Sequence, residues 1–163
     1  MKNLEDKVIL VCGGASGIGA ASARRLCEEG ASVAIGDINL ELAEKTASEC
    51  GNAVAFRYDQ ADEASINALV SQTLAHYGKL NGLFANAADL QTVLVDGDVL
   101  SNDIHIWERT MAVNVTGTAM LVRASLPYLL EQGGGAIVCT SSGASTIGEA
   151  ERPAYAASKA GVN

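Results

Sequence analysis

Short apolar runs alternate with amphipathic stretches along most of the chain. The apolar runs are KVILVC (7–12), ASVAIGD (31–37), NAVAFRYD (52–59), GLFANA (82–87) and GAIVCTSS (135–142). Apolar runs of this length, bounded by glycine or polar residues, are typical of buried β-strands. We therefore predict five strands, spread over the chain and separated by longer segments.

The segments between these runs have the spacing of helices. Helices are predicted for residues 18–29, 40–49, 62–77 and 103–131, the last with a soft point near Gly117, and a final helix begins at Pro153. Glycine follows three of the helices, as is usual at helix C-caps. In the third helix the residues on the buried face are Ile66, Leu69, Val70, Thr73 and Leu74.

This β-α alternation predicts an α/β protein with a Rossmann-like, doubly wound parallel sheet. Right-handed crossovers place helices on both faces of such a sheet, and we expect the strand order 3-2-1-4-5. Residues 89–102 are the long irregular stretch, and no linker or repeat divides residues 1–163 into further domains. The chain stops at Asn163, shortly after the last helix begins, and nothing there is typical of a domain end.

The charge balance narrows the possible partners. The 163 residues carry a net charge of −8 without a run of Lys or Arg, which argues against a nucleic-acid partner or an anionic membrane surface. No stretch reaches about 18 apolar residues, so no membrane span is expected. No apolar segment of the signal-peptide type follows MKNLEDK, and we expect a cytoplasmic location.

The four cysteines do not predict a metal site. They are widely spaced, form no C-x-x-C motif, and the two histidines, His76 and His105, are isolated. We expect four buried free thiols in a reducing compartment, namely Cys12, Cys27, Cys50 and Cys139.

The segment CGGASGIG (12–19) joins the first strand to the first helix. Gly13, Gly17 and Gly19 allow a turn out of the strand, close approach of the backbone to a pyrophosphate, and close packing of helix on strand. The helix N-terminus offers free N–H groups and the positive end of its dipole to a phosphate. A P-loop is excluded because no Gly-Lys-Ser/Thr follows. The glycine pattern alone is a weak indication of a dinucleotide site.

An acidic residue strengthens that interpretation. Asp37 ends the second strand, where a carboxylate can accept hydrogen bonds from both ribose hydroxyls of an adenosine. The same carboxylate repels a 2′-phosphate, and Ser16 in the loop offers no positive charge to one. These features favour NAD over NADP.

A second group of candidate residues lies near the end of the chain. Tyr155 and Lys159 are four residues apart and share a helix face. An ammonium group beside a phenol favours the phenolate, so the pair can supply a base near neutral pH. Ser142 lies at the carboxyl end of the fifth strand, the edge where open α/β sheets bind ligands. A lone Y-x-x-x-K pattern is also common on ordinary surface helices.

Taken together, these motifs resemble the short-chain dehydrogenase/reductase family from residue 7 to residue 163. CGGASGIG is similar to the family's TGxxxGxG, NAA (86–88) stands where NAG is usual, and YAASK (155–159) fits YxxxK. MAVNVTG (111–117) contains the family's helix asparagine, and Ser142 precedes the tyrosine by the usual 13 residues. Five ordered motifs are strongly specific, although no single one is.

The resemblance implies an oxidoreductase that transfers a hydride between NAD(H) and a secondary alcohol or ketone. Tyr155 would be the acid/base, Lys159 would assist it and hold the nicotinamide ribose, Ser142 would steady the substrate oxygen, and Asn114 would hold a water in a proton relay. The implied cofactor residues are Gly13, Ser16, Gly17, Ile18, Gly19, Asp37, Ile38, Asp59, Gln60, Asn86, Ala87, Ala88, Tyr155 and Lys159. The family also pairs its long helix and its Tyr-Lys helix across a two-fold axis, which implies a homodimer or homotetramer.

The sequence departs from the family pattern at several positions. Cys12 replaces the usual Thr, Ala88 replaces Gly, and Gln60 stands where an apolar residue is common. The family's sixth and seventh strands, and the loop between them that covers the nicotinamide, do not follow Asn163. We therefore expect these 163 residues alone to bind the adenosine half of the cofactor with little turnover.

Two alternatives remain at this point. One is a non-catalytic nucleotide-binding fragment or interaction module, which the end of the chain at Asn163 leaves open. The other is the extended branch of the superfamily, whose usual G-x-x-G-x-x-G spacing does not fit the glycines of this chain. The identity of the substrate is not encoded in any recognised motif.

Overall fold

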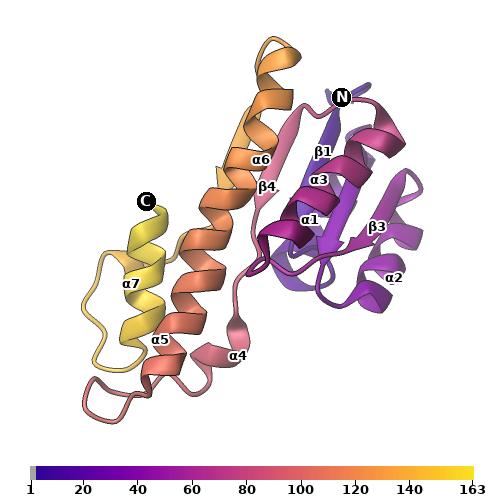
Figure 1. Ribbon diagram of the computed structural model, residues 1–163. Coiled ribbons are helices and arrows are strands. Elements are labelled where there is room, and N and C mark those ends of the chain that lie inside the picture. Colours follow the sequence, from indigo (N-terminus) through magenta and orange to yellow (C-terminus); the bar gives the residue numbers. More distant parts are fainter. Residues whose placement is uncertain (1–2) are drawn as a thin grey trace.

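Five parallel strands form one sheet in the computed structural model, which describes residues 3–163 (Figure 1). The strand order is β3-β2-β1-β4-β5, which confirms the predicted fold class and strand order. The strands are β1 (Val8–Cys12), β2 (Ser32–Asp37), β3 (Ala53–Arg57), β4 (Gly82–Ala85) and β5 (Ala136–Cys139). Each lies within an apolar run of the sequence and is shorter than that run.

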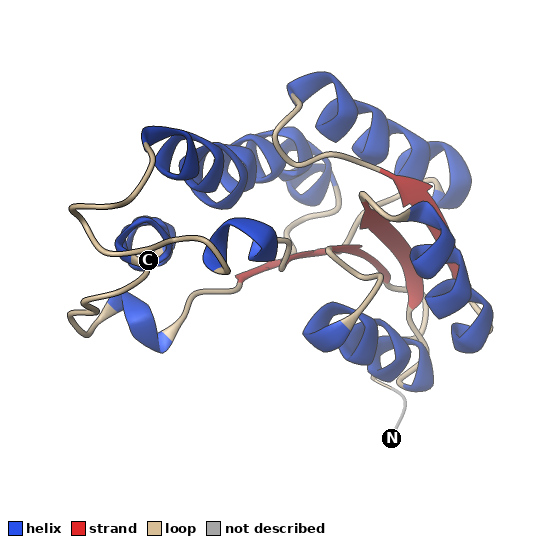
Figure 2. Ribbon diagram, turned by 90° about the horizontal axis from the view of Figure 1, so that it is seen from below, coloured by secondary structure: helices blue, strands red, loops and turns tan. Residues whose placement is uncertain are grey.

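Helices cover both faces of the sheet (Figure 2). Their bounds are α1 (Gly17–Glu28), α2 (Leu40–Cys50), α3 (Glu63–Tyr77), α4 (Leu90–Val93), α5 (Ile104–Met111), the π-helix η1 (Ala112–Gly117), α6 (Thr118–Glu131), the 3₁₀-helix η2 (Gly143–Ser145) and α7 (Pro153–Val162). Within the described part of the chain, none of these helices has both the length and the apolar character needed to cross a membrane.

Neighbouring residues of a strand point to opposite faces of the sheet. Helices cover both faces, so both sets of side chains are buried. Leu10 packs in a cluster with residues of α3 and α6, whereas the next residue, Val11, packs in a cluster with residues of α1 and α2. Val11 pairs in register with Ile35 on β2 and Phe84 on β4, so β1 is the central strand. Because all five strands are parallel, their carboxyl ends lie at one edge of the sheet, where the predicted site residues are located.

The helical stretch predicted over residues 103–131 is divided by a π-helical turn. The π-helix η1 spans Ala112–Gly117, so the soft point expected near Gly117 lies at its end. A Cβ on Gly117 would lie 2.1 Å from the carbonyl oxygen of Gln60, so only glycine allows this close contact. The irregular stretch 89–102 also contains the short helix α4, which its sequence pattern did not predict.

The prediction of four buried thiols was wrong in part. All four cysteines are free, but only Cys12 is buried, whereas Cys27, Cys50 and Cys139 are partly exposed. Cys27 and Cys50 lie near the C-terminal ends of α1 and α2, and Cys139 lies on the edge strand β5, where neighbouring elements cover a side chain only on some sides. Among residues 3–163, no group of three or more His, Cys, Asp or Glu side chains is arranged to hold a metal ion.

Candidate active site

A cavity of about 630 Å³ lies at the carboxyl ends of the strands. Residues that follow or end all five strands line it, which is where open α/β sheets bind ligands. The predicted site residues that line it are Gly13, Ser16, Gly17, Ile18, Asp37, Ile38, Asp59, Gln60, Asn86, Ala87, Ala88, Tyr155 and Lys159. The structure thus brings the two ends of the predicted site into one cavity, whereas Gly19, Asn114 and Ser142 lie outside its lining.

The glycine-rich turn presents the start of α1 to this cavity. The backbone of Gly13 is left-handed (φ 78°), and its N–H donates to the carbonyl of Gly36 at 2.8 Å. A Cβ on Gly13 would lie 2.7 Å from the Cα of Ala87, so the turn packs directly on the segment after β4. The side chain of Ser16 makes no capping hydrogen bond to α1, which leaves the first-turn N–H groups available to an anion.

Gly19 is buried and holds the turn against α1 rather than facing the cavity. A Cβ at this position would lie 1.9 Å from the carbonyl oxygen of Gly13. No side chain fits in that space, so the glycine allows the helix to pack closely on the turn, as expected for one glycine of this loop.

Asp37 sits at the end of β2 with its carboxylate already oriented. One oxygen accepts a hydrogen bond from the N–H of Ala15 at 3.0 Å, and the other accepts from the N–H of Asn39 at 3.0 Å. Each carboxylate oxygen has further lone pairs, so both can also accept from ligand hydroxyl groups. The two backbone bonds fix the carboxylate beside the glycine turn.

Asn86 ties three strand ends together. Its N–H donates to the carbonyl of Cys12 at 3.1 Å, and its Nδ2 donates to the carbonyl of Gly13 at 3.2 Å. The hydroxyl of Thr140, which follows β5, donates to Asn86 Oδ1 at 3.0 Å. Cys12 stands where the family usually has Thr. Asn86 nevertheless connects the first turn to the segment after β4.

Tyr155 and Lys159 enter the cavity from α7. The Nζ of Lys159 donates to the carbonyl of Thr140 at 2.8 Å and lies 5.8 Å from the centroid of the Tyr155 ring. Lys159 is only 3% exposed. Burial lowers the pKa of Lys159, and the nearby Cys139 opposes part of that shift. The ammonium group is thus held between the end of β5 and the tyrosine ring.

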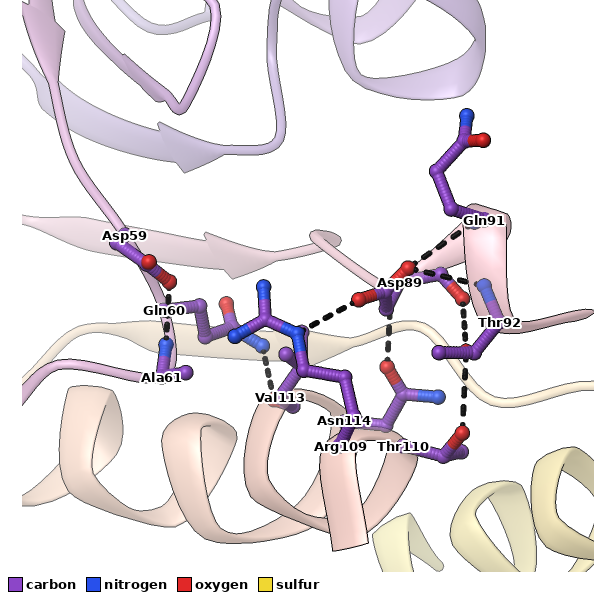
Figure 3. A network of polar contacts seen from close by, with 10 residues as sticks. All are labelled: Asp59, Gln60, Ala61, Asp89, Gln91, Thr92, Arg109, Thr110, Val113 and Asn114. Atoms are coloured by element: carbon purple, nitrogen blue, oxygen red, sulfur yellow. Dashed lines mark hydrogen bonds and ion pairs between the residues drawn. The ribbon is translucent and has the colours of Figure 1, made fainter. Parts of the chain in front are cut away.

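Asn114 lies in η1 behind the cavity wall. Its Oδ1 accepts from the N–H of Asp89 at 3.0 Å (Figure 3). Its Nδ2 donates to the hydroxyl of Ser158 on α7 at 3.0 Å. The residue is 1% exposed. Asn114 therefore connects the segment after β4 to the helix that carries the tyrosine and the lysine.

Gln60 joins the end of β3 to the π-helix. Its Nε2 donates to the carbonyl of Val113 at 2.7 Å (Figure 3). It also donates to the hydroxyl of Thr118 at 3.2 Å. Its Oε1 accepts from the hydroxyl of Tyr58. Both the oxygen and the nitrogen of the Gln60 side-chain amide therefore have protein partners. These bonds stabilise the π-helical turn that contains Asn114.

Ser142 has a different environment from that of Tyr155. Its hydroxyl accepts from the N–H of Ala144 at 3.2 Å, and so it caps η2. The side chain is half-buried and lies outside the cavity lining. The structure therefore does not bring Ser142 to the lining that contains Tyr155.

Sequence analysis missed an ion pair in the cavity wall. Asp89 accepts from Nε of Arg109 at 2.8 Å and from the N–H groups of Gln91 and Thr92 at 3.0 and 3.1 Å (Figure 3). Asp89 is the N-cap of α4, and an Asp before a short apolar segment is a recognisable N-cap signal. Other lining residues that were not predicted are Tyr58, Leu90, Gln91, Val113 and Thr140.

Comparison with known proteins identifies relatives along nearly the whole chain. The model of the short chain dehydrogenase family matches residues 7–163. The 2,5-dichloro-2,5-cyclohexadiene-1,4-diol dehydrogenase of Sphingobium indicum is 40% identical over 164 residues, which cover 99% of this chain and 64% of that protein. Short-chain dehydrogenase reductase 5 of Arabidopsis thaliana is 37% identical over 161 residues, covering 97% and 61%.

Solved structures show the same architecture. Levodione reductase superposes with a TM-score of 0.90 at 29% identity, covering 98% of this chain and 63% of that chain. NAD⁺-bound xylitol dehydrogenase superposes with a TM-score of 0.91 at 30% identity, covering 98% and 62%. The chain thus spans less than two thirds of the length of each of these relatives.

Proposed function

Because this chain belongs to the short chain dehydrogenase family, we propose that the protein transfers a hydride between NAD(H) and a secondary alcohol or ketone. The observation that carries this proposal is the shared cavity. Tyr155 and Lys159 line the same space as the glycine turn and Asp37. In this proposal Tyr155 and Lys159 serve as the proton-transfer pair, and the glycine turn with Asp37 binds the dinucleotide in the same cavity.

The residues of the cavity fit a dinucleotide. Gly17, the first residue of α1, lines the cavity, and a Cβ there would have no atom within 4 Å, so the backbone at the start of α1 is open to a pyrophosphate. Asp37 would accept the adenosine ribose hydroxyls, Asp59 would bind the adenine amine, and Lys159 would hold the second ribose. When bound, NAD(H) supplies the hydride acceptor or donor.

The protein manages one proton in this proposal. The phenolate oxygen of Tyr155 takes the proton of the alcohol when the alcohol is oxidised. The phenolic hydroxyl gives a proton to the ketone oxygen when the ketone is reduced. Lys159 is fixed by the carbonyl of Thr140 and places its positive charge 5.8 Å from the centroid of the tyrosine ring. Ser142 would steady the substrate oxygen by donating its hydroxyl proton, because its oxygen only accepts in the bond from the N–H of Ala144.

Asn114 has a positioning role in the same account. Its amide is bonded to Asp89 at one end and to Ser158 at the other, so it fixes α7 relative to η1. The water relay implied by the resemblance stays a prediction, as does the homodimer or homotetramer. Leu126 and Leu130 leave apolar surface exposed on α6, which is compatible with such an assembly.

The test of the proposed function has two parts, both with the full-length protein. NADH fluorescence is titrated to measure cofactor binding, and NADH formation at 340 nm is followed with NAD and a panel of linear and cyclic secondary alcohols. Binding together with turnover of at least one alcohol supports the proposal. Binding without turnover of any alcohol or ketone across pH 6–10 favours a non-catalytic nucleotide-binding module.

Replacing Asp37 should change the cofactor preference. We expect Asp37→Ala to weaken NAD binding about tenfold or more, because hydrogen bonds to a charged group are worth about 1.5–3 kcal/mol. NADP binding should improve relative to NAD, because the carboxylate no longer repels the 2′-phosphate. The dissociation constants of both cofactors are measured by titration for each variant.

Glu41→Gln is the matched control for this experiment. It removes an acidic charge from the exposed first turn of α2, four residues after Asp37, and Glu41 does not line the cavity. Its preference for NAD should match that of the unmutated protein. Tighter binding of NADP than of NAD by the unmutated protein would show that the cofactor assignment is wrong.

Lys159 should make cofactor binding sensitive to alkaline pH. Burial lowers the pKa of Lys159 from its ordinary value of 10.5, and the ammonium exists only below that pKa. NADH affinity should therefore be highest near neutral pH and fall as the pH rises through the lowered pKa. Lys159→Met should bind NADH more weakly at pH 7 and lose this dependence. An equal alkaline decline in the Met variant would exclude Lys159 as the group responsible.

A further inference from the structure

The helix that carries Tyr155 and Lys159 has no N-cap from its own sequence. α7 begins at Pro153, and the side chain of the preceding residue, Arg152, makes no capping hydrogen bond. The backbone of Arg152 is left-handed (φ 65°), a conformation that residues other than glycine rarely adopt. The N–H groups in the first turn of a helix need partners, so the start of α7 must be held by another part of the chain.

Asp96 supplies those partners from the loop between α4 and α5. Its Oδ2 accepts from the N–H of Tyr155 at 2.8 Å, and its Oδ1 accepts from the N–H of Ala154 at 3.4 Å. Its backbone carbonyl accepts from the N–H of Arg152 at 3.2 Å. The Nδ2 of Asn102, in the same loop, also donates to Oδ1.

Asp96 is 5% exposed. Burial of a charged group is unfavourable unless hydrogen bonds compensate, and here three donors converge on the carboxylate. A negative charge at the start of a helix is also stabilised by the helix dipole. Figure 1 shows the start of α7 beside the loop between α4 and α5.

The second turn of α7 has separate anchors. The Nζ of Lys159 donates to the carbonyl of Thr140, and the backbone carbonyl of Lys159 accepts from the hydroxyl of Ser141 at 2.9 Å. These bonds connect the lysine to the end of β5 and do not involve Asp96. Loss of Asp96 should therefore release the turn that contains Tyr155 while Lys159 stays in place.

We propose that Asp96 is a positioning residue that orients Tyr155 by capping α7. This inference rests on the proposed function, because it assigns Asp96 a task in the placement of the acid/base. Asp96 does not line the cavity, so it acts through the backbone of Tyr155 rather than on a substrate. Its removal should lower turnover and leave cofactor binding nearly unchanged.

Asp98 provides a matched control in the same loop. Its Oδ1 accepts from the N–H groups of Leu100 and Ser101 at 2.8 and 2.9 Å, so it stabilises a turn of the loop. Asp98 is exposed and has no contact with α7 among the hydrogen bonds of the described residues. Asp98→Ala therefore removes the same chemical group from the same loop without removing the cap.

The experiment compares Asp96→Ala, Asp96→Asn and Asp98→Ala with the unmutated full-length protein. Three quantities are measured: amide hydrogen exchange of peptides that cover residues 153–163, the NADH dissociation constant, and kcat with NAD and the best alcohol of the panel. The exchange measurement does not depend on catalysis.

We expect amides at the start of α7 to exchange at least tenfold faster in Asp96→Ala than in the unmutated protein. Its kcat should fall at least tenfold, and its NADH dissociation constant should change less than threefold. Asp96→Asn keeps one acceptor for the N–H of Tyr155, so its exchange rate and kcat should lie between those of Asp96→Ala and the unmutated protein. If Asp96→Ala does not fold, Asp96→Asn is compared with Asp98→Ala instead. Asp98→Ala should stay within twofold of the unmutated protein in all three quantities.

Two results would overturn the inference. One is unchanged exchange at the start of α7 in both Asp96 variants. The other is a kcat for Asp96→Ala that matches that of Asp98→Ala. If the unmutated protein oxidises no alcohol, the proposed function fails, and the exchange measurement alone then decides whether Asp96 holds α7.

Discussion

Tyr155→Phe is expected to lower turnover by about a hundredfold or more while NADH still binds. The hydroxyl of Tyr155 is the group assigned to proton transfer, and general acid–base catalysis contributes about 10²–10⁴-fold. The phenylalanine ring keeps the aromatic surface 5.8 Å from the ammonium of Lys159. The bond from Lys159 to the carbonyl of Thr140 does not involve the hydroxyl, so the cofactor side of the cavity should persist.

The measurement is kcat with NAD and the best alcohol of the panel, together with the NADH dissociation constant. Tyr128→Phe is the control, because it makes the same chemical change on α6 and Tyr128 does not line the cavity. The control should retain full turnover. Near-normal turnover of Tyr155→Phe across pH 6–9 would remove Tyr155 as the acid/base.

Gly19→Ala should damage both the fold and the cofactor site. The added Cβ would lie 1.9 Å from the carbonyl oxygen of Gly13 and 3.0 Å from Nδ2 of Asn86, so α1 must shift away from the glycine turn. Overpacking of this kind costs about 1–3 kcal/mol of folding free energy. Since the shift moves the helix N-terminus relative to the turn, NADH affinity should fall about tenfold or more.

The sign of the stability change makes this prediction decisive. Alanine favours a helix over glycine by about 1 kcal/mol, so without the contact Gly19→Ala should stabilise the protein. The free energy of unfolding is measured by denaturant titration. Gly148→Ala is the control, because no atom lies within 4 Å of the added Cβ and the backbone of Gly148 is not left-handed. A gain in stability for Gly19→Ala would contradict the packing described for the turn.

The sheet and the glycine turn after β1 could be predicted because their signals are local. Residues 8–12 form an uninterrupted apolar run, and the structure places them in the central strand. The glycines that follow allow a left-handed turn at Gly13 and close packing at Gly19, and both features follow from the absence of a side chain. Such properties are encoded in a few consecutive residues.

The features that sequence analysis missed depend on contacts between distant residues. Asp96 caps α7 by accepting from the N–H of Ala154, 58 residues later in the chain, and neither segment carries a signal for the other. The π-helix is accompanied by the contact between Gln60 and Val113, 53 residues apart. Tertiary structure decides these contacts. Ser142, by contrast, follows β5 as predicted, and its hydroxyl caps η2 through a local hydrogen bond from the N–H of Ala144, two residues away.

Transfer of deuterium tests the proposed function most directly. The full-length protein is incubated with NAD and the best secondary alcohol of the panel, deuterated at the carbinol carbon, and the nicotinamide product is analysed by mass spectrometry. The proposal predicts one deuterium in each reduced cofactor and one ketone formed for each, with both products greatly reduced in Tyr155→Phe. Reduced cofactor without deuterium, or no reduced cofactor with any alcohol despite tight NADH binding, would contradict it.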